Sequence, residues 1–409
     1  MNLKSTYTIF LTLLMAFVAS CSDNAPESER PQENLEELPQ ASFRVNALGV
    51  SSAAQSGPQE CIKSLRVIII NSDGLIEANE KTEWSSSPKG AATFSHIFSK
   101  SLNSKSKDLY LIANEESIGD FSLTDSEDLP SLPSSSLSDL LDYFRKETAA
   151  ENSGMGDVFG KVLNRIYFEN DLSNLSAGNM IYLPYSAHYK LEANDLGLSG
   201  LTHPLYLVPV ASKIDFSFVS YRSHDTRIED VSLNNANVHN YLNAQLANDE
   251  TLKPFNDKMI WWIDWLQECA KNSETAEDIE DFNEKWGWIQ HYSLPLSNDA
   301  SVKSLKPSSE VWKIDRMADK NNPDRKSFGP FYIPESKSSS YELNFEVTDL
   351  ATNETTFLEG YEIDTMMSLF RATHVKIFIE LYEKAMDIYS EVVPWNEKVF
   401  IGYVQEDDD

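Results

Sequence analysis

One cysteine near the start of the chain has neighbours that give it recognisable chemistry. Cys21 follows Val18, Ala19 and Ser20, and this VASC stretch matches a lipobox. The small Ala19 and Ser20 would admit a lipoprotein signal peptidase, and the Cys21 sulfur would be the nucleophile that takes a diacylglycerol. Cys21 is therefore the predicted lipid attachment residue. The alternative is an ordinary signal peptide with a chance cysteine near its end.

Catalytic patterns are missing from the rest of the sequence. It contains no H-E-x-x-H, C-x-x-C, Walker or G-x-S-x-G motif. S-x-x-K matches at Ser86 and Ser104 come without S-D-N or K-T-G, and no two of the seven histidines have metal-ligand spacing. We therefore predict that the protein is not an enzyme, with no catalytic residue, no metal and no cofactor. A lipid-anchored hydrolase using paired carboxylates stays open, because carboxylates are abundant.

Tryptophan is the second group with recognisable chemistry. Five of the eight tryptophans lie in the stretch 261–288. Aromatic platforms bind sugars and peptides, so Trp286 and Trp288 are candidate recognition residues for a host or bacterial surface ligand. The alternative is a buried role, because Trp262 lies on an apolar helical stripe with Met259 and such stripes are usually core.

The segments around Cys21 are those of an exported and tethered chain. Lys4 is the only charge among the first 22 residues, and the apolar run Ile9–Ser20 is shorter than the ~20 residues that span a bilayer. Residues 1–20 are therefore a predicted signal peptide. Residues 21–40 hold six acids and three prolines, which predicts an acylated flexible tether or propeptide, anchored in the outer membrane by its acyl chains.

The charge balance excludes one class of partner. The chain has 34 Lys and Arg against 64 Asp and Glu, a formal net charge of −30. A surface this acidic repels phosphate backbones, so nucleic acid is not an expected partner. Cys61 and Cys269 remain after lipidation, and the sequence leaves open whether they form a disulfide.

Beyond the tether, the hydrophobic pattern is mainly that of short strands. Alternation or short apolar runs bounded by turn residues predict strands at 42–50, 61–74, 108–116, 179–194, 205–221, 340–350, 374–382 and 386–395. Helical spacing appears within 131–146 and near 255–290. The prediction is a mainly β fold of two β-sandwich domains, 41–200 and 201–409, with helical insertions and terminal strands at 374–401.

Several stretches, taken in order, resemble the fimbrillin family of lipoprotein pilins, whose fibres are also called type V pili. After the lipobox these are SLRVIIINSDG at 64–74, LYLIANEE at 109–116, LYLVPVASKIDFSF at 205–218, SLFRATHVKIFIEL at 368–381 and VVPWNEKVF at 392–400. The last two are the most specific, because they are similar to the closing hairpin of the family. Together the stretches span most of the chain, although 255–288 matches nothing in the family.

The resemblance implies a structural subunit of a cell-surface fimbrium that supports adhesion. Family members are two transthyretin-like sandwiches, exported as acylated precursors, from which a protease removes the first strand. The C-terminal strands of another subunit then fill the groove, pairing through their backbone while alternate side chains enter pockets. The candidate donor residues are Val375, Ile377, Ile379, Leu381, Ile388, Val392 and Trp395.

Two features depart from the family pattern. Family maturation uses an arginine-specific protease after the first strand, but the candidate Arg44 falls inside that strand and 45–62 holds neither Arg nor Lys. The link Tyr382–Met386 between the last two strands suits a tight local hairpin, so these strands could pair with each other within their own chain. A processed shaft subunit, an unprocessed lipid-bound fimbrial anchor, and a tip adhesin or glycan-binding lipoprotein all stay open.

Analysis of the N-terminus of the protein taken from cells separates the first two alternatives. A processed subunit is expected to begin at Val45 or slightly later, because a protease has removed the first strand with the tether. An anchor is expected to begin at a blocked, acylated Cys21. A free N-terminus close to Cys21 would contradict lipid attachment.

Overall fold

The structure is a computed structural model of the chain. The chain divides into two compact units, and only the second, Pro39–Asp409, contains described residues. The structure describes residues 40–47, 60, 62–83, 91–97, 106–124, 132–133, 136–146, 155–169, 182–191, 205–243, 302–306, 309–317, 325–337, 341–363, 368–369, 371, 373–383 and 385–394.

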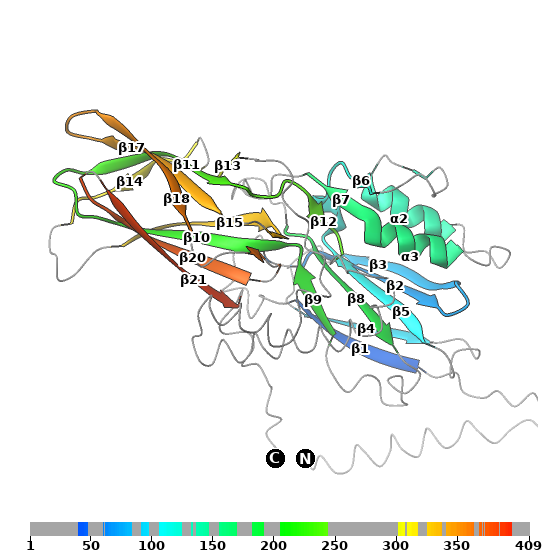
Figure 1. Cartoon of the computed structure of the whole chain (residues 1–409). Helices are drawn as coiled ribbons and strands as arrows, with labels where there is room; N and C mark the ends of the chain where they lie inside the picture. Colours follow the sequence, from blue (N-terminus) through cyan, green and yellow to red (C-terminus); the bar gives the residue numbers. More distant parts are fainter. Residues whose placement is uncertain are drawn as a thin grey trace, which may run out of the picture. The chain divides into compact units, whose positions relative to one another are not determined.

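The first half of the described chain builds a seven-stranded sheet in the order β3-β2-β5-β8-β9-β1-β4 (Figure 1). Its strands are β1 (Gln40–Ala47), β2 (Ser64–Asn71), β3 (Ile76–Glu83), β4 (Ala91–Ile97), β5 (Lys107–Ala113), β8 (Tyr185–Leu191) and β9 (Leu205–Pro209). Neighbouring strands run antiparallel except β1 and β9, which run parallel. Every residue of β2 is buried, which explains its continuous apolar run.

Two helices, α2 (Leu137–Lys146) and α3 (Met155–Arg165), pack against this sheet (Figure 1). The Ser136 hydroxyl accepts a hydrogen bond of 3.0 Å from the Asp139 backbone N–H and caps the start of α2. Side chains three and four apart on each helix are fully buried in the first core: Leu137, Leu140, Leu141, Phe144, Phe159, Val162 and Leu163. Neither helix of the described ranges is long and apolar enough to cross a membrane.

Several short elements come from both halves of the chain. A 3-10 helix, η3 (Glu115–Ser117), follows β5 directly. A three-stranded sheet has the order β12-β7-β6. Its strands are β6 (Ser122–Leu123), β7 (Ile166–Phe168) and β12 (Asn240–Tyr241), and a separate pair joins β16 (Ser336–Lys337) to β19 (Ser368–Leu369).

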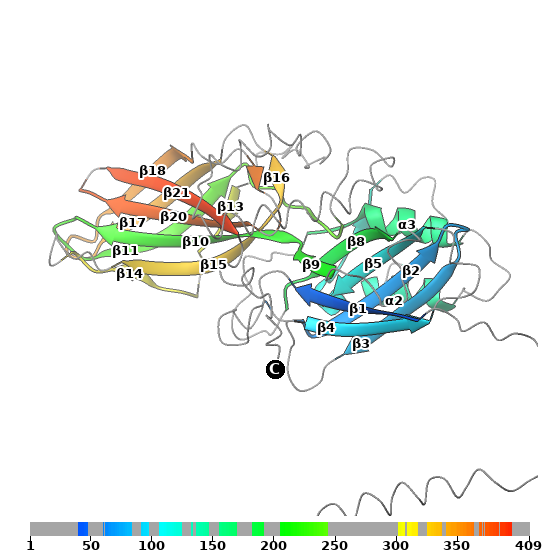
Figure 2. The same cartoon turned by 90° about the horizontal axis from the view of Figure 1, so that it is seen from below.

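The second half builds two further sheets around a second core (Figure 2). One has the order β15-β10-β20-β21, and the other the order β13-β11-β17-β18 with β14 also paired to β11. Their bounds are β10 (Ala211–Ser220), β11 (Thr226–Asn234), β13 (Val302–Ser304), β14 (Trp312–Ile314), β15 (Lys326–Pro334), β17 (Glu342–Asp349), β18 (Thr355–Glu362), β20 (Thr373–Leu381) and β21 (Met386–Pro394). Trp312 is buried between the sheets and stacks on Phe328 with 4.3 Å between ring centroids.

The predicted mainly β class is confirmed, and most predicted strands fall on observed ones. The prediction omits α3 and several strands, the longest of which are β3, β4, β11, β15 and β18. In β11 a bulge between Ile228 and Asp230 interrupts the alternation, and in β15 Gly329 and Pro330 have the composition of a turn. The predicted helical insertion near 255–290, Cys61 and Cys269 lie outside the described residues.

Candidate functional site

β20 is an internal strand of its sheet. Its residues 374–381 pair parallel with 213–220 of β10, and 373–381 pair antiparallel with 386–394 of β21. Both of its edges are therefore occupied within this chain. The pairing with β21 is the local hairpin that the short link between the two strands favours. Four predicted donor residues of β20 are fully or almost fully buried in the second core: Val375, Ile377, Ile379 and Leu381.

β21 is the last strand of that sheet (Figures 1 and 2). Met386 is buried in the second core and the predicted donor residue Ile388 packs against it, half-buried. Asp387 and Tyr389 alternate with them and are exposed. The side chain of Val392 and the whole of Trp395 lie outside the described residues. One edge of β21 is thus paired with β20, and its other edge has no partner among the described strands.

An aromatic pair lies on the outer face of β20 and β21. Phe378 and Tyr389 are opposite each other in the ladder, and their rings stack at 4.8 Å. The Arg325 guanidinium lies 5.5 Å from the Phe378 ring centroid and donates a hydrogen bond of 3.1 Å to the Tyr389 hydroxyl. These contacts hold the Tyr389 ring in place although 47% of the residue is exposed.

β1 lies inside the first sheet, between β4 and β9. It pairs antiparallel with β4 over 40–46 and parallel with β9 over 45–47. The predicted cleavage residue Arg44 lies opposite Thr93 in this ladder. Among the described strands, β4 has no partner except β1. β1 therefore joins β4 to the rest of the sheet.

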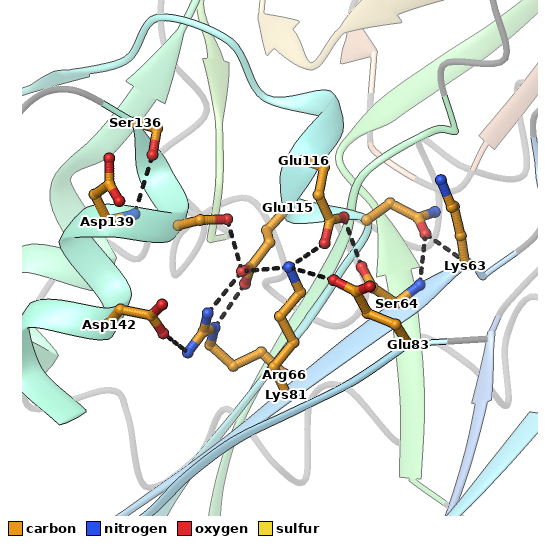
Figure 3. A network of polar contacts seen from close by, with 12 residues as sticks. Lys63, Ser64, Arg66, Lys81, Glu83, Glu115, Glu116, Ser136, Asp139 and Asp142 are labelled. Carbon is orange, nitrogen blue, oxygen red and sulfur yellow. Dashed lines mark hydrogen bonds and ion pairs between the residues drawn. The ribbon is translucent and has the colours of Figure 1, made fainter. Parts of the chain in front are cut away.

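A buried ion pair connects β2, η3 and α2 (Figure 3). Arg66 and Glu115 are each 1% exposed, and Nε and Nη2 of Arg66 donate hydrogen bonds of 2.7 Å to the two carboxylate oxygens. Nη1 donates to Asn79 of β3 at 2.9 Å and to Asp142 of α2 at 3.1 Å. Ser138 of α2 donates to Glu115 at 2.9 Å. These bonds satisfy the bidentate pair and fix the helix on the sheet.

Lys81 and Glu116 extend this network toward solvent (Figure 3). Lys81 Nζ contacts the carboxylates of Glu83, Glu115 and Glu116. Burial alone would lower the pKa of Lys81, but these carboxylates raise it above its ordinary value. Burial alone would raise the pKa of Glu116, but hydrogen bonds from Lys81 and Ser64 lower it. Each charge has a partner, which is typical of a structural network.

A second buried ion pair precedes β20. Nε of Arg371 donates a hydrogen bond of 2.9 Å to Glu335. Nη2 and Nη1 donate to the backbone oxygens of Tyr241 and Leu242, at 3.0 Å and 3.2 Å. Arg371 is the arginine of the Arg-Ala-Thr-His stretch. That stretch therefore positions the start of β20 against the segment that carries β12.

His374 contacts Asp215 across the sheet, with 2.7 Å between Nε2 and the carboxylate. No group of three or more His, Cys, Asp and Glu side chains in the described residues could hold a metal ion. Cys21, Trp286 and Trp288 lie outside the described residues. Lipid attachment and aromatic recognition therefore stay predictions.

The sequence patterns do not predict the roles of the buried arginines or the stacking of Phe378 on Tyr389. One usable signal was Arg66, which interrupts the apolar run SLRVIIIN, because a charge in a buried strand needs a partner. Phe378 gave another signal, since it stands on the half-buried side of an alternating strand.

Comparison with solved structures finds distant likenesses. The tip fimbrial protein Mfa3 of Porphyromonas gingivalis, with a C-terminal truncation, is 11% identical; the match covers 87% of this chain and 100% of that one, with a TM-score of 0.44. A protein of Bacteroides eggerthii proposed to act in cell adhesion is 11% identical, with coverage of 87% and 96% and a TM-score of 0.43. No family model and no curated protein matches the chain. The function is therefore proposed below from the residues of this chain.

Replacing Ile377 by alanine tests whether β20 belongs to its own core. We expect the free energy of unfolding to fall by about 2–5 kcal/mol, because the side chain is fully buried. Lys376→Ala on the outer side of the same strand is the matched control, with an expected loss below about 1 kcal/mol. Chemical denaturation measures both. Equal, small losses would mean that β20 is not packed in this core.

A second pair of variants tests the network of Figure 3. Glu115→Ala is expected to destabilise the fold by about 3–5 kcal/mol, because it leaves the Arg66 charge buried without its main partner. The neighbouring Glu116→Ala removes a partly exposed carboxylate and is expected to cost about 0–1 kcal/mol. If the two variants unfolded at the same denaturant concentration, the buried pair would not hold the helix.

Proposed function

We propose that the protein is a structural subunit of a cell-surface fimbrium that assembles by strand donation and supports adhesion. Its partners would be other fimbrial subunits, in a polymer of one or several kinds, and the outer membrane through acyl chains on Cys21. The proposal includes two transthyretin-like domains at 41–200 and 201–409. Two separate hydrophobic cores support two domains, but β9 and Ala211 belong to the first core and Ile214 to the second, which favours a boundary between 211 and 214 rather than at 200.

The observation that carries the proposal is the place of β1. It is the first strand after the acidic tether, yet it lies between β4 and β9 rather than at a sheet edge. Its withdrawal would leave the facing edges of both neighbours with unpaired backbone groups. A strand from another subunit could restore both ladders. A single cut behind β1 would thus detach the tether and open an acceptor slot.

The donating strand has to leave its own sheet. β20 is paired on both edges and its four apolar side chains lie in the core, so its removal would dismantle the second core. β21 has one paired edge. We therefore assign donation to the chain from Met386 onward, with Ile388, Val392 and Trp395 as contact residues.

An unprocessed anchor is the second candidate, and the ladder around Arg44 favours it. A protease binds its substrate as an extended strand, but the backbone at Arg44 is already paired with β4. A cut there would also leave Val45–Ala47, the part that pairs with β9. A subunit that keeps β1 and its acyl chains would hold the base of a fimbrium in the outer membrane.

A chain that begins at Leu48 tests the proposal. Without β1, purified subunits are expected to associate into ladders that resist heating in detergent on gels, because the open slot accepts a strand from a neighbour. The chain that retains β1 is expected to run as a monomer under the same conditions.

A synthetic peptide of residues 40–47 serves as the control. Added in excess during refolding, it should fill the slot and suppress the ladders, whereas a scrambled peptide should not. A shortened chain that stays monomeric and folded would remove the support for strand donation. The anchor would then be the better description.

A further inference from the structure

β21 is the edge of its sheet that is open to strand addition. Its outer edge has no partner among the described strands, and its only proline is the last residue, Pro394. The strand at the other end of the sheet, β15, carries Pro330 in its middle. Proline in an edge strand blocks pairing because it lacks an N–H. β15 is thus protected, whereas β21 is not.

The outward side chains of β21 are acidic on both sides of one ring. Asp387, Tyr389 and Glu391 follow each other at period two, and the strand contains no Lys or Arg. The inward residues Met386 and Ile388 continue the apolar core to the edge. A strand added to β21 would therefore meet two different rows, one acidic and aromatic, the other apolar.

One of these acids lacks a favourable partner across the ladder. Asp387 lies directly opposite Glu380 of β20, and like charges in this position are destabilising. The Arg325 guanidinium lies 3.8 Å from the Glu380 carboxylate and is shared with the Tyr389 hydroxyl. Glu391, by contrast, has Lys376 opposite it. A positively charged side chain beside Asp387 would therefore be stabilising.

Tyr389 provides a rigid contact in the middle of this row. Its ring is stacked on Phe378 and its hydroxyl is bonded to Arg325, while nearly half of the residue stays exposed. A ring that is already fixed loses little conformational entropy on binding, which is the behaviour of interface hot spots.

We propose that the outer edge of β21 receives an extended segment of a partner protein with basic residues at alternate positions. Lys or Arg of that segment lies beside Asp387 and Glu391, an aromatic or apolar side chain lies beside Tyr389, and apolar side chains lie beside Met386 and Ile388. Backbone pairing supplies the binding energy, and the acidic row selects the partner.

This inference goes beyond the proposed function and concerns a subunit whose β21 stays in its own sheet. One copy of β21 cannot both leave its sheet as a donor and stay in that sheet to receive a strand. The two roles are tested separately, because the peptide experiment below uses the monomeric chain with β1 in place. Failure of ladder formation would not affect it.

The test measures binding of labelled peptides to the purified full chain by fluorescence anisotropy. The probe Val-Lys-Val-Tyr-Val-Lys-Val places both lysines and the tyrosine on one face. Val-Glu-Val-Tyr-Val-Glu-Val reverses the charge, and Val-Val-Lys-Tyr-Lys-Val-Val keeps the composition but shifts the lysines to the other face. The first probe is expected to bind at least about tenfold more tightly than either of the others.

Charge-reversal variants locate the site. Asp387→Lys with Glu391→Lys should invert the preference, so that the glutamate peptide binds and the lysine peptide does not. Glu359→Lys with Glu362→Lys makes the same change of charge on β18, an edge strand of the other sheet, and should leave the preference unchanged. Tyr389→Ala should weaken binding of the first probe. Circular dichroism confirms that each variant is folded.

A backbone control separates strand addition from simple charge attraction. Two methylated forms of the first probe, one at its valine N–H groups and one at its lysine and tyrosine N–H groups, each remove the hydrogen-bond donors of one edge without changing the charge. One of the two forms should lose binding. Equal binding of the alternating and shifted peptides, equal loss in the two double variants, or unchanged binding of both methylated forms would each mean non-specific attraction to an acidic surface. Any of these results overturns the proposal.

Discussion

Backbone pairing is the constraint on which this molecule depends. A strand inside a sheet must pair its N–H and C=O groups on both edges, because an unpaired buried group costs about as much as a lost hydrogen bond. β1 and β20 come from opposite ends of the chain, and each pairs one of its edges with the same continuous segment. β1 runs parallel to β9, and β20 runs parallel to β10, which follows β9 after one residue. Residues 205–220 thus pair with a strand from each end of the chain.

Buried charges reinforce that segment and its surroundings. Lys213 of β10 donates to the buried carboxylate of Glu60 at 2.9 Å, and the Tyr332 hydroxyl donates to the same carboxylate at 3.2 Å. Arg371 fixes the entry to β20, as Arg66 fixes α2 on the first sheet. Such pairs add little net stability, but removing one partner is costly. They therefore specify a single arrangement of strands whose apolar faces alone could pack in several registers.

Local pattern identified many of the strands but could not assign their neighbours. The alternation of β20 predicts a half-buried strand, and the structure has one, yet the same alternation suits a donor strand and a central strand equally well. Its parallel partner β10 lies far away in the sequence, so no local signal connects them. The bulge in β11 and the Gly329–Pro330 pair in β15 hid true strands. The Arg66–Glu115 pair joins residues far apart in sequence, and only the charge in an apolar run hinted at it.

The late position of β20 in the chain also has a consequence for folding. Among the described residues, the central strand β20 of the second core and its hairpin partner β21 come last in the sequence. β20, the parallel neighbour of β10, is synthesised about 160 residues after it. Contacts between segments this far apart in sequence form slowly. The second core consequently cannot be completed until residues 373–394 have been made.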